Sequence, residues 1–223
     1  MKEKKELKGI NKVLFVTVLT IGVIVGVLFI AFVIEISQPK ALKPIIYLYP
    51  ETEMQVSVKL SNSEKLSCSY PKYIDSWNVL AKPSGDLIDK KTNKYFYSLY
   101  WEGKQYSNGL DYIDGFCIKG EDTARFLEEK LKVLGLNEKE ANEFIIYWLP
   151  KMESNKYNYI KFKSTEEINE YMGLDISPVP DTLIRVFMDF KPLNKHITLK
   201  EQQLSAPNRE GFVVVEWGGS EVK

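Results

Sequence analysis

The sequence predicts an α+β protein in which one amino-terminal transmembrane helix is followed by a single soluble domain. Residues 13–34 carry no charged side chain, and they are long enough and apolar enough to cross a bilayer as a helix. The rest of the chain indicates strands, then helices, then strands, which is typical of helices packed on one face of an antiparallel or mixed sheet. The predicted boundaries are a cytoplasmic basic segment at 1–12, a transmembrane helix at 13–34, a linker at 35–44 and an extracytoplasmic domain at 45–223.

The flanks of the apolar segment predict its orientation. Lysine side chains are concentrated before it, at Lys2, Lys4, Lys5, Lys8 and Lys12. Basic residues favour the cytoplasmic side, so the domain is expected outside the cell as part of a single-pass protein of the cell membrane. A cleaved signal peptide and a buried helix of a soluble protein are the alternatives, but a signal peptide has a shorter apolar region that ends in small residues.

Two glycines suggest a further role for the predicted membrane helix. Gly22 and Gly26 are four residues apart and are flanked by branched side chains. This spacing leaves a shallow groove where two helices can approach closely, which predicts a homodimer. A plain anchor without association is the alternative.

Charge and size restrict the class of protein. Residues 1–40 hold 6 of the 30 basic and 3 of the 30 acidic residues, which leaves 24 basic against 27 acidic in the domain. This balance lacks the concentrated basic field of a nucleic-acid-binding protein. A domain of this size forms a sizeable core without disulfides, so Cys68 and Cys117 are expected to be buried free thiols, with a disulfide between them as the alternative.

Alternating apolar and polar side chains predict the strands of the first half. Alternation or apolar runs cover residues 45–49, 54–60 and 66–70, and the turn between the last two favours a hairpin. Further strands are expected at 77–81, 87–88, 95–101 and 116–118. Residues 45–118 therefore indicate a largely antiparallel sheet.

Helical periodicity and capping signals follow. A helix is expected over 122–134, and a second begins at Asn137, whose capping-box partner is Glu140, and ends at Pro150. Together they form an αα-hairpin inserted between the strands and packed on the sheet. The remaining elements are a strand at 157–163, a short helix between Ser164 and Gly173, and strands at 184–190 and 212–217.

Residues that commonly carry catalysis or bind metals are sparse. His196 is the only histidine and lacks evident partners, so it is interpreted as a surface residue, and Cys117 lies in a predicted interior strand. Asp111 and Asp114 resemble part of an acidic calcium loop but lack a third ligand and a distal Glu, so a plain turn is favoured. No metal site and no cofactor is predicted.

Two tryptophan and glutamate pairs are the strongest candidates for a site. Trp101 and Glu102 precede Gly103, while Glu216 and Trp217 precede Gly218. Aromatic planes beside carboxylates suit sugar recognition, and two carboxylates about 5 to 9 Å apart can cleave a glycosidic bond. The alternative is that the tryptophans are core residues and the glutamates are solvated. Asp189, which follows an apolar run, is added as a further candidate ligand residue.

Several motifs resemble those of a family of uncharacterised bacterial proteins that are exported or linked to the membrane. The matching stretches are Lys-Pro-Ile-Ile-Tyr-Leu-Tyr-Pro at 43–50, Trp-Glu-Gly at 101–103, Tyr-Trp-Leu-Pro at 147–150, Pro-Asp-Thr at 180–182 with Arg185 and Val186, and Gly-Phe-Val-Val-Val-Glu-Trp-Gly-Gly at 211–219. The resemblance implies one continuous domain and brings no known activity.

The sequence therefore predicts a binding or interaction module at the cell envelope, whose partner is a glycan or a protein. Two rival functions are a glycan hydrolase that uses Glu102 and Glu216, and a structural subunit of a membrane complex.

Overall fold

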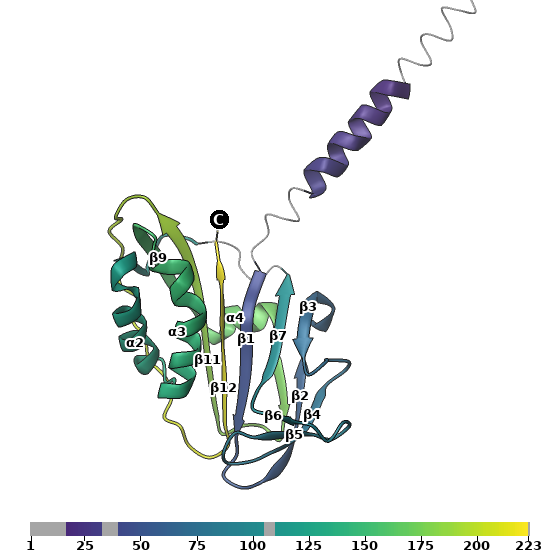
Figure 1. Cartoon of the computed structure of the whole chain (residues 1–223), viewed down its shortest axis with the longest axis vertical. Coiled ribbons are helices and arrows are strands. Elements are labelled where there is room, and N and C mark those ends of the chain that lie inside the picture. Colours follow the sequence, from purple (N-terminus) through teal and green to yellow (C-terminus); the bar gives the residue numbers. More distant parts are fainter. Residues whose placement is uncertain (1–16, 33–39, 105–109, 223) are drawn as a thin grey trace, which may run out of the picture. The chain divides into compact units, whose positions relative to one another are not determined.

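The computed structural model describes residues 17–32, 40–104 and 110–222. The chain divides into two compact units, Met1–Gln38 and Pro39–Lys223. The second unit holds all the strands and is the domain considered in the rest of the text (Figure 1).

The described part of the first unit does not show the predicted transmembrane helix. Its described helical residues are 17–32, and within the described parts of the chain no helix is both long and apolar enough to cross a membrane. The prediction of a transmembrane signal anchor over 13–34 is therefore wrong, because a span needs about 20 apolar helical residues. The basic segment 1–12 and residues 33–39 lie outside the described residues. Gly22 and Gly26 have open space around them, and the homodimer expected from their spacing stays a prediction.

The domain is built on a mixed sheet of seven strands. Its β11 and β12 are parallel and its other neighbours are antiparallel. The spatial order is β3 (Leu66–Tyr70), β7 (Leu99–Lys104), β1 (Lys40–Tyr49), β12 (Val213–Glu221), β11 (Thr182–Leu193), β9 (Tyr157–Lys163) and β8 (Phe116–Lys119). β1 begins inside the predicted linker.

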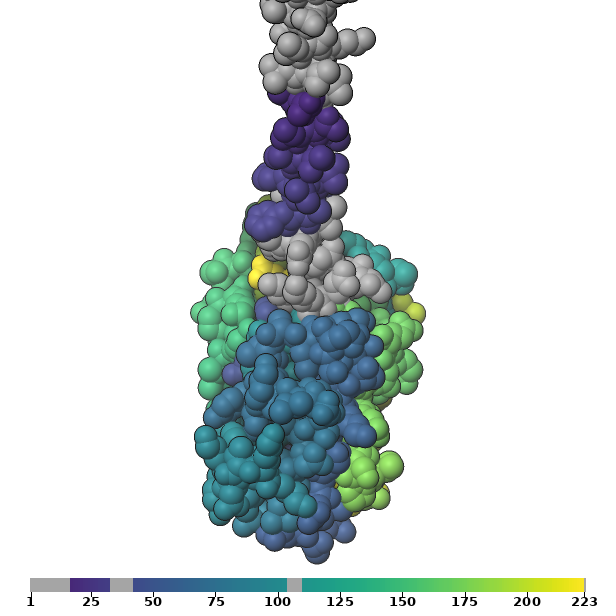
Figure 2. Space-filling view, turned by 90° about the vertical axis from the view of Figure 1, so that its right-hand side faces the viewer, coloured from purple at the N-terminus to yellow at the C-terminus, as the bar shows by residue number. Residues whose placement is uncertain are grey.

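A second sheet of five strands packs against one face of the first. Its order is β10 (Leu174–Ser177), β2 (Met54–Leu60), β4 (Trp77–Ala81), β5 (Leu87–Asp89) and β6 (Tyr95–Phe96). In Figure 2 the blue residues, which include most of these strands, cover much of this side of the domain. α4 (Thr165–Tyr171) adds Ile168 to the core between the sheets.

The opposite face of the seven-stranded sheet is covered by the αα-hairpin of α2 (Thr123–Val133) and α3 (Glu138–Met152) (Figure 1). Successive side chains of the central strands point alternately into two cores, one between the two sheets and one between the large sheet and the helices. On β12, Val213, Val215 and Trp217 face the helices, while Val214 faces the second sheet. Eight of the nine β12 residues are buried, as expected of a strand with both faces covered.

The two capping boxes of the sequence are confirmed, whereas Asp122, the expected cap of the first helix, makes no capping hydrogen bond with its side chain. Asn137 accepts a hydrogen bond from the backbone of Glu140 at 2.9 Å, and the Glu140 side chain accepts one from the backbone of Asn137 at 2.8 Å. Ser164 and Glu167 form the same motif before α4. Pro150 does not end α3, which continues to Met152.

Two predicted strand arrangements are wrong. The expected hairpin of 54–60 and 66–70 does not form, because β2 belongs to the smaller sheet and β3 to the larger one. The single strand expected at 95–101 is divided into β6 and β7, which also lie in different sheets. Both thiols are free, but Cys68 is exposed, so its predicted burial is wrong.

The connection from β11 to β12 is a long strap over residues 194–212, because parallel neighbours cannot be joined by a tight turn. The Gln202 side chain accepts from the backbone N–H of Phe162 at 2.8 Å and donates to its carbonyl at 2.9 Å. Arg209 holds the buried Glu140 with two hydrogen bonds of 2.9 and 3.0 Å. These contacts fix the strap against β9 and α3.

A buried ion pair joins the layers between the two sheets. Arg185 of β11 and Glu216 of β12 lie opposite each other, and both side chains are fully buried. Nε of Arg185 donates to Glu216 at 2.6 Å, and the other guanidinium nitrogens donate to the Asn169 side chain at 2.6 Å and the Met172 carbonyl at 2.9 Å. Trp101 of β7 donates to the second carboxylate oxygen at 2.8 Å. One cluster thus links three strands to α4.

We expect Arg185→Met to lower the free energy of unfolding by about 3 to 5 kcal/mol, because it leaves the Glu216 carboxylate buried without a cation. The double variant Arg185→Met with Glu216→Leu should lower the free energy of unfolding by clearly less than Arg185→Met alone, since no charge is then buried. Urea unfolding followed by tryptophan fluorescence measures both. A double variant as unstable as the sum of the two single variants would contradict this account.

Candidate functional site

Three of the predicted site residues are part of the cores. Trp101 and Glu216 lie between the sheets in the ion-pair cluster, and neither is accessible to solvent. Trp217 lies on the other face of β12, where its ring meets Phe144 edge-on at 5.3 Å. These side chains hold the layers together, which agrees with the structural interpretation of the two tryptophans.

Asp189 is also fully buried. It accepts a hydrogen bond from the Ser220 hydroxyl at 2.5 Å, and the Lys163 ammonium group lies 3.5 Å from it. Its carboxylate is thus used within the domain.

Glu102 and Glu216 do not share a cleft. Trp101 is buried between the sheets, so its neighbour Glu102 projects from the opposite face of β7. The seven-stranded sheet therefore separates the two carboxylates. The structure does not bring together the pair that glycosidic cleavage requires.

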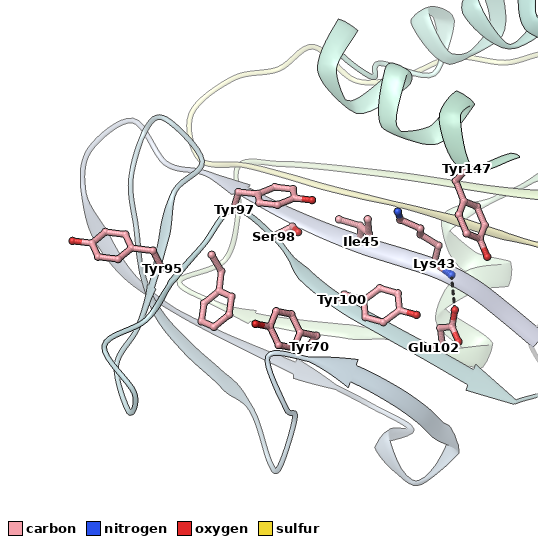
Figure 3. Close-up of a pocket in the computed structure, with 10 residues that line it drawn as sticks. Lys43, Ile45, Tyr70, Tyr95, Tyr97, Ser98, Tyr100, Glu102 and Tyr147 are labelled. Atoms are coloured by element: carbon pink, nitrogen blue, oxygen red, sulfur yellow. Dashed lines mark hydrogen bonds between the residues drawn. The ribbon is translucent and has the colours of Figure 1, made fainter. Parts of the chain in front are cut away.

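Glu102 instead lines a tyrosine-rich pocket on the helix side of the seven-stranded sheet. The pocket has a volume of about 490 Å³, within the usual range of roughly 300 to 1,000 Å³ for small-molecule sites. It is formed by β1, β7, the end of β3, the β6–β7 connection and α3 (Figure 3). Its lining residues are Lys43, Ile45, Tyr70, Tyr95, Phe96, Tyr97, Ser98, Tyr100, Glu102 and Tyr147.

A bulge in β1 shapes one wall of this pocket. The register of β1 shifts before Ile45 against both of its neighbours, at the position of Lys43 and Pro44. Lys43 has φ 54°, in the left-handed region that side chains other than glycine rarely adopt. Its backbone N–H points at Glu102, 3.4 Å from the carboxylate (Figure 3). Bulges and strained residues of this kind are concentrated at functional sites.

A glycine of the predicted motif makes room for the bulge. A Cβ atom at Gly218 would lie 3.0 Å from the Cα atom of Pro44 and 3.1 Å from the Phe187 ring. Close approach of two backbones therefore requires glycine at this position.

Tyr147 brings α3 to the opposite wall of the pocket. Residues Lys139, Glu143, Tyr147 and Lys151 recur every fourth position, so they lie in one row along the helix. The ammonium groups of Lys43 and Lys151 lie 5.2 and 4.5 Å from the centre of the Tyr147 ring. Lys139 lies 5.1 Å from the Tyr97 ring. Cations thus flank the tyrosines along the pocket.

Burial and the carboxylate keep the pocket tyrosines protonated. Burial raises the pKa of Tyr100 well above its ordinary value of about 10, and the hydrogen bond to Glu102 and its negative charge raise it further. Burial, and then the charge of Glu102, also raise the pKa of Tyr147. Both phenols therefore remain hydrogen-bond donors at neutral pH.

The weaker sequence candidates lie outside the tyrosine-rich pocket. Lys161 places its ammonium group 2.6 Å from Asp111 and 2.9 Å from Asp114, so a lysine occupies the centre of the acidic turn. His196 is exposed, and its ring meets Tyr157 at 5.6 Å. Among the residues that the structure describes, no group of three or more His, Cys, Asp or Glu side chains is arranged to hold a metal ion.

Of the residues singled out from the sequence, Glu102 lines the pocket, and its other lining residues were not among the candidates. Tyr70, Tyr147 and the stretch that holds Tyr97 and Tyr100 are far apart in the sequence and converge only in the fold. For Tyr100 a signal was present, because it alternates with the core residues Leu99 and Trp101 and therefore points to the other face of its strand. The row on α3 was visible as a spacing of four residues.

We expect Glu102→Gln to lower the pKa of Tyr100, because it removes the negative charge that opposes ionisation of the phenol. Titration followed by carbon NMR of labelled tyrosine measures this shift. Glu143→Gln is the matched control, since Glu143 accepts its hydrogen bond from Tyr47, at 2.7 Å. An unchanged Tyr100 titration in Glu102→Gln would contradict the assigned contact.

Comparison of the chain with protein-family models, with curated proteins and with solved structures finds no match. The family resemblance of the motifs therefore stays a prediction. The function is inferred from the geometry of the pocket alone.

Proposed function

We propose that the domain is a binding module that holds a saccharide in the tyrosine-lined pocket. The observation that carries this proposal is a pair of exposed tyrosines that belong to neither core. Tyr70 and Tyr97 are 64% and 50% exposed, yet both line the same hollow. Exposed apolar surface gathered around a concavity is typical of a binding site.

The chemistry of the lining favours a sugar over a purely apolar ligand. A pyranose ring has C–H faces that stack on aromatic rings, and a rim of hydroxyl groups. Glu102 accepts hydrogen bonds, while the phenols of Tyr100 and Tyr147 remain protonated. An apolar ligand would remove water from the half-buried Glu102 without replacing its hydrogen bonds, which is costly.

The pocket is better suited to binding than to hydrolysis. Glu102 is the one carboxylate among its described lining residues, whereas most glycoside hydrolases use two. The envelope glycan that the sequence suggested as a partner belongs to the class of ligand proposed here.

We expect the full chain to bind at least one tetrasaccharide from a panel of chitotetraose, cellotetraose, maltotetraose and tetragalacturonic acid, measured by isothermal titration calorimetry. Tyr70→Ala and Tyr97→Ala should each weaken binding by roughly two- to tenfold, because an aromatic contact is worth about 0.5 to 1.5 kcal/mol. Both side chains are exposed, so neither change should disturb the fold.

Tyr112→Ala is the matched control. Tyr112 is also an exposed tyrosine, at 44%, and does not line the pocket, so its removal should leave binding unchanged. Failure of every sugar to bind, or binding that survives both pocket substitutions, would reject the proposal. Binding of unstructured peptides in place of sugars would identify a protein partner.

A further inference from the structure

We propose that the saccharide bound in this pocket carries an acidic group, a carboxylate or a phosphate, that pairs with the ammonium group of Lys43. The inference rests on the proposed sugar-binding function and adds the charge of the ligand. Its basis is a half-buried cation that lines the pocket and has no carboxylate partner.

Lys43 differs from comparable lysines of the domain. Lys161 and Lys163 have side chains that are only 12% exposed, and each lies within 4 Å of two carboxylates. Lys43 is also partly buried, but among the described residues no carboxylate lies within ion-pairing distance of its ammonium group. Lys65 and Lys130 also lie over aromatic rings, but neither lines this pocket.

Glu102 does not neutralise Lys43, although the two residues are neighbours in the pocket. The carboxylate accepts from the backbone N–H of Lys43 at 3.4 Å, and burial, together with this carboxylate, raises the pKa of Tyr100. The ammonium group lies over the Tyr147 ring instead (Figure 3). The pocket thus presents a hydrogen-bond acceptor and a cation at different places, which suits a ligand with both hydroxyl groups and an acid.

The strained backbone of Lys43 accounts for this separation. With φ in the left-handed region, the bulge directs the backbone N–H to Glu102 and the side chain across the pocket to α3. Such strain persists only where the surrounding structure holds it in place. Lys139 and Lys151 extend the positive charge along α3 at the rings of Tyr97 and Tyr147.

The test compares pairs of sugars with and without an acidic group. We expect tetragalacturonic acid to bind about tenfold more tightly than its methyl ester, or glucose 6-phosphate to bind more tightly than glucose, in calorimetric titrations of the full chain. The first pair detects a carboxylate and the second a phosphate. Added salt should weaken binding of the acid more than binding of its neutral counterpart, because salt screens charge pairs.

Lys43→Met should reduce the ratio between the affinities for the acidic sugar and its neutral counterpart to about one. Lys43→Arg should retain the preference for the acidic sugar. Lys132→Met is the matched control, since Lys132 is an exposed lysine of α2 that does not line the pocket. The ligand comparison in the unmodified protein needs no variant, so misfolding of Lys43→Met would not prevent the test.

The outcomes separate this inference from the proposed function. Equal binding of the charged and neutral members of both pairs would overturn the acidic ligand and leave sugar binding intact. No binding of any sugar would overturn both. A charge preference that persists in Lys43→Met would assign the anion contact to another cation and reject the role of Lys43.

Discussion

The buried ion pair of Arg185 and Glu216 is the interaction on which the arrangement of the domain depends. Removing two charges from water is expensive, and the cost is offset only where each polar atom finds a partner. Here Trp101, Asn169 and the Met172 carbonyl complete the set. Because these partners come from β7 and from the α4 region, α4 must meet the seven-stranded sheet in one way for the charges to be satisfied. Apolar packing alone would tolerate several arrangements.

The same interaction determines the pocket on the other side of the sheet. Successive residues of a strand point to opposite faces, so fixing Trp101 between the sheets directs Tyr100 and Glu102 toward the helices. The Trp-Glu-Gly motif thus combines a structural tryptophan with a site residue. Glu216 and Trp217 reverse the combination, because there the carboxylate is in the ion pair and the tryptophan packs under α3. Similar motifs therefore have different roles, which alternation explains and residue type does not.

Local signals in the sequence were predictive and long-range pairings were not. The two capping boxes, the αα-hairpin and the bounds of 54–60, 66–70 and 157–163 agree with the structure because they depend on neighbouring residues. The hairpin expected between the first two ranges failed, since alternation shows that one face is buried but does not show against which sheet. The break between β6 and β7 at Tyr97 and Ser98 could not be predicted either, because the alternation of aromatic residues continues through it.

The pocket was harder to predict than the fold because it lies at the edge of the seven-stranded sheet, where the αα-hairpin no longer covers the strands. The hairpin of α2 and α3 packs on the strands from β8 to β1, which leaves β7 and β3 at the edge beyond α3. Edge strands with exposed apolar side chains invite unwanted pairing unless their surface is modified. Tyrosines solve this problem with rings that shield the strands and hydroxyl groups that stay hydrated. A side chain that is stable both in water and against an apolar surface can also contact a polar ring-shaped ligand. Protection of the sheet edge and recognition of a ligand therefore favour the same type of residue at these positions.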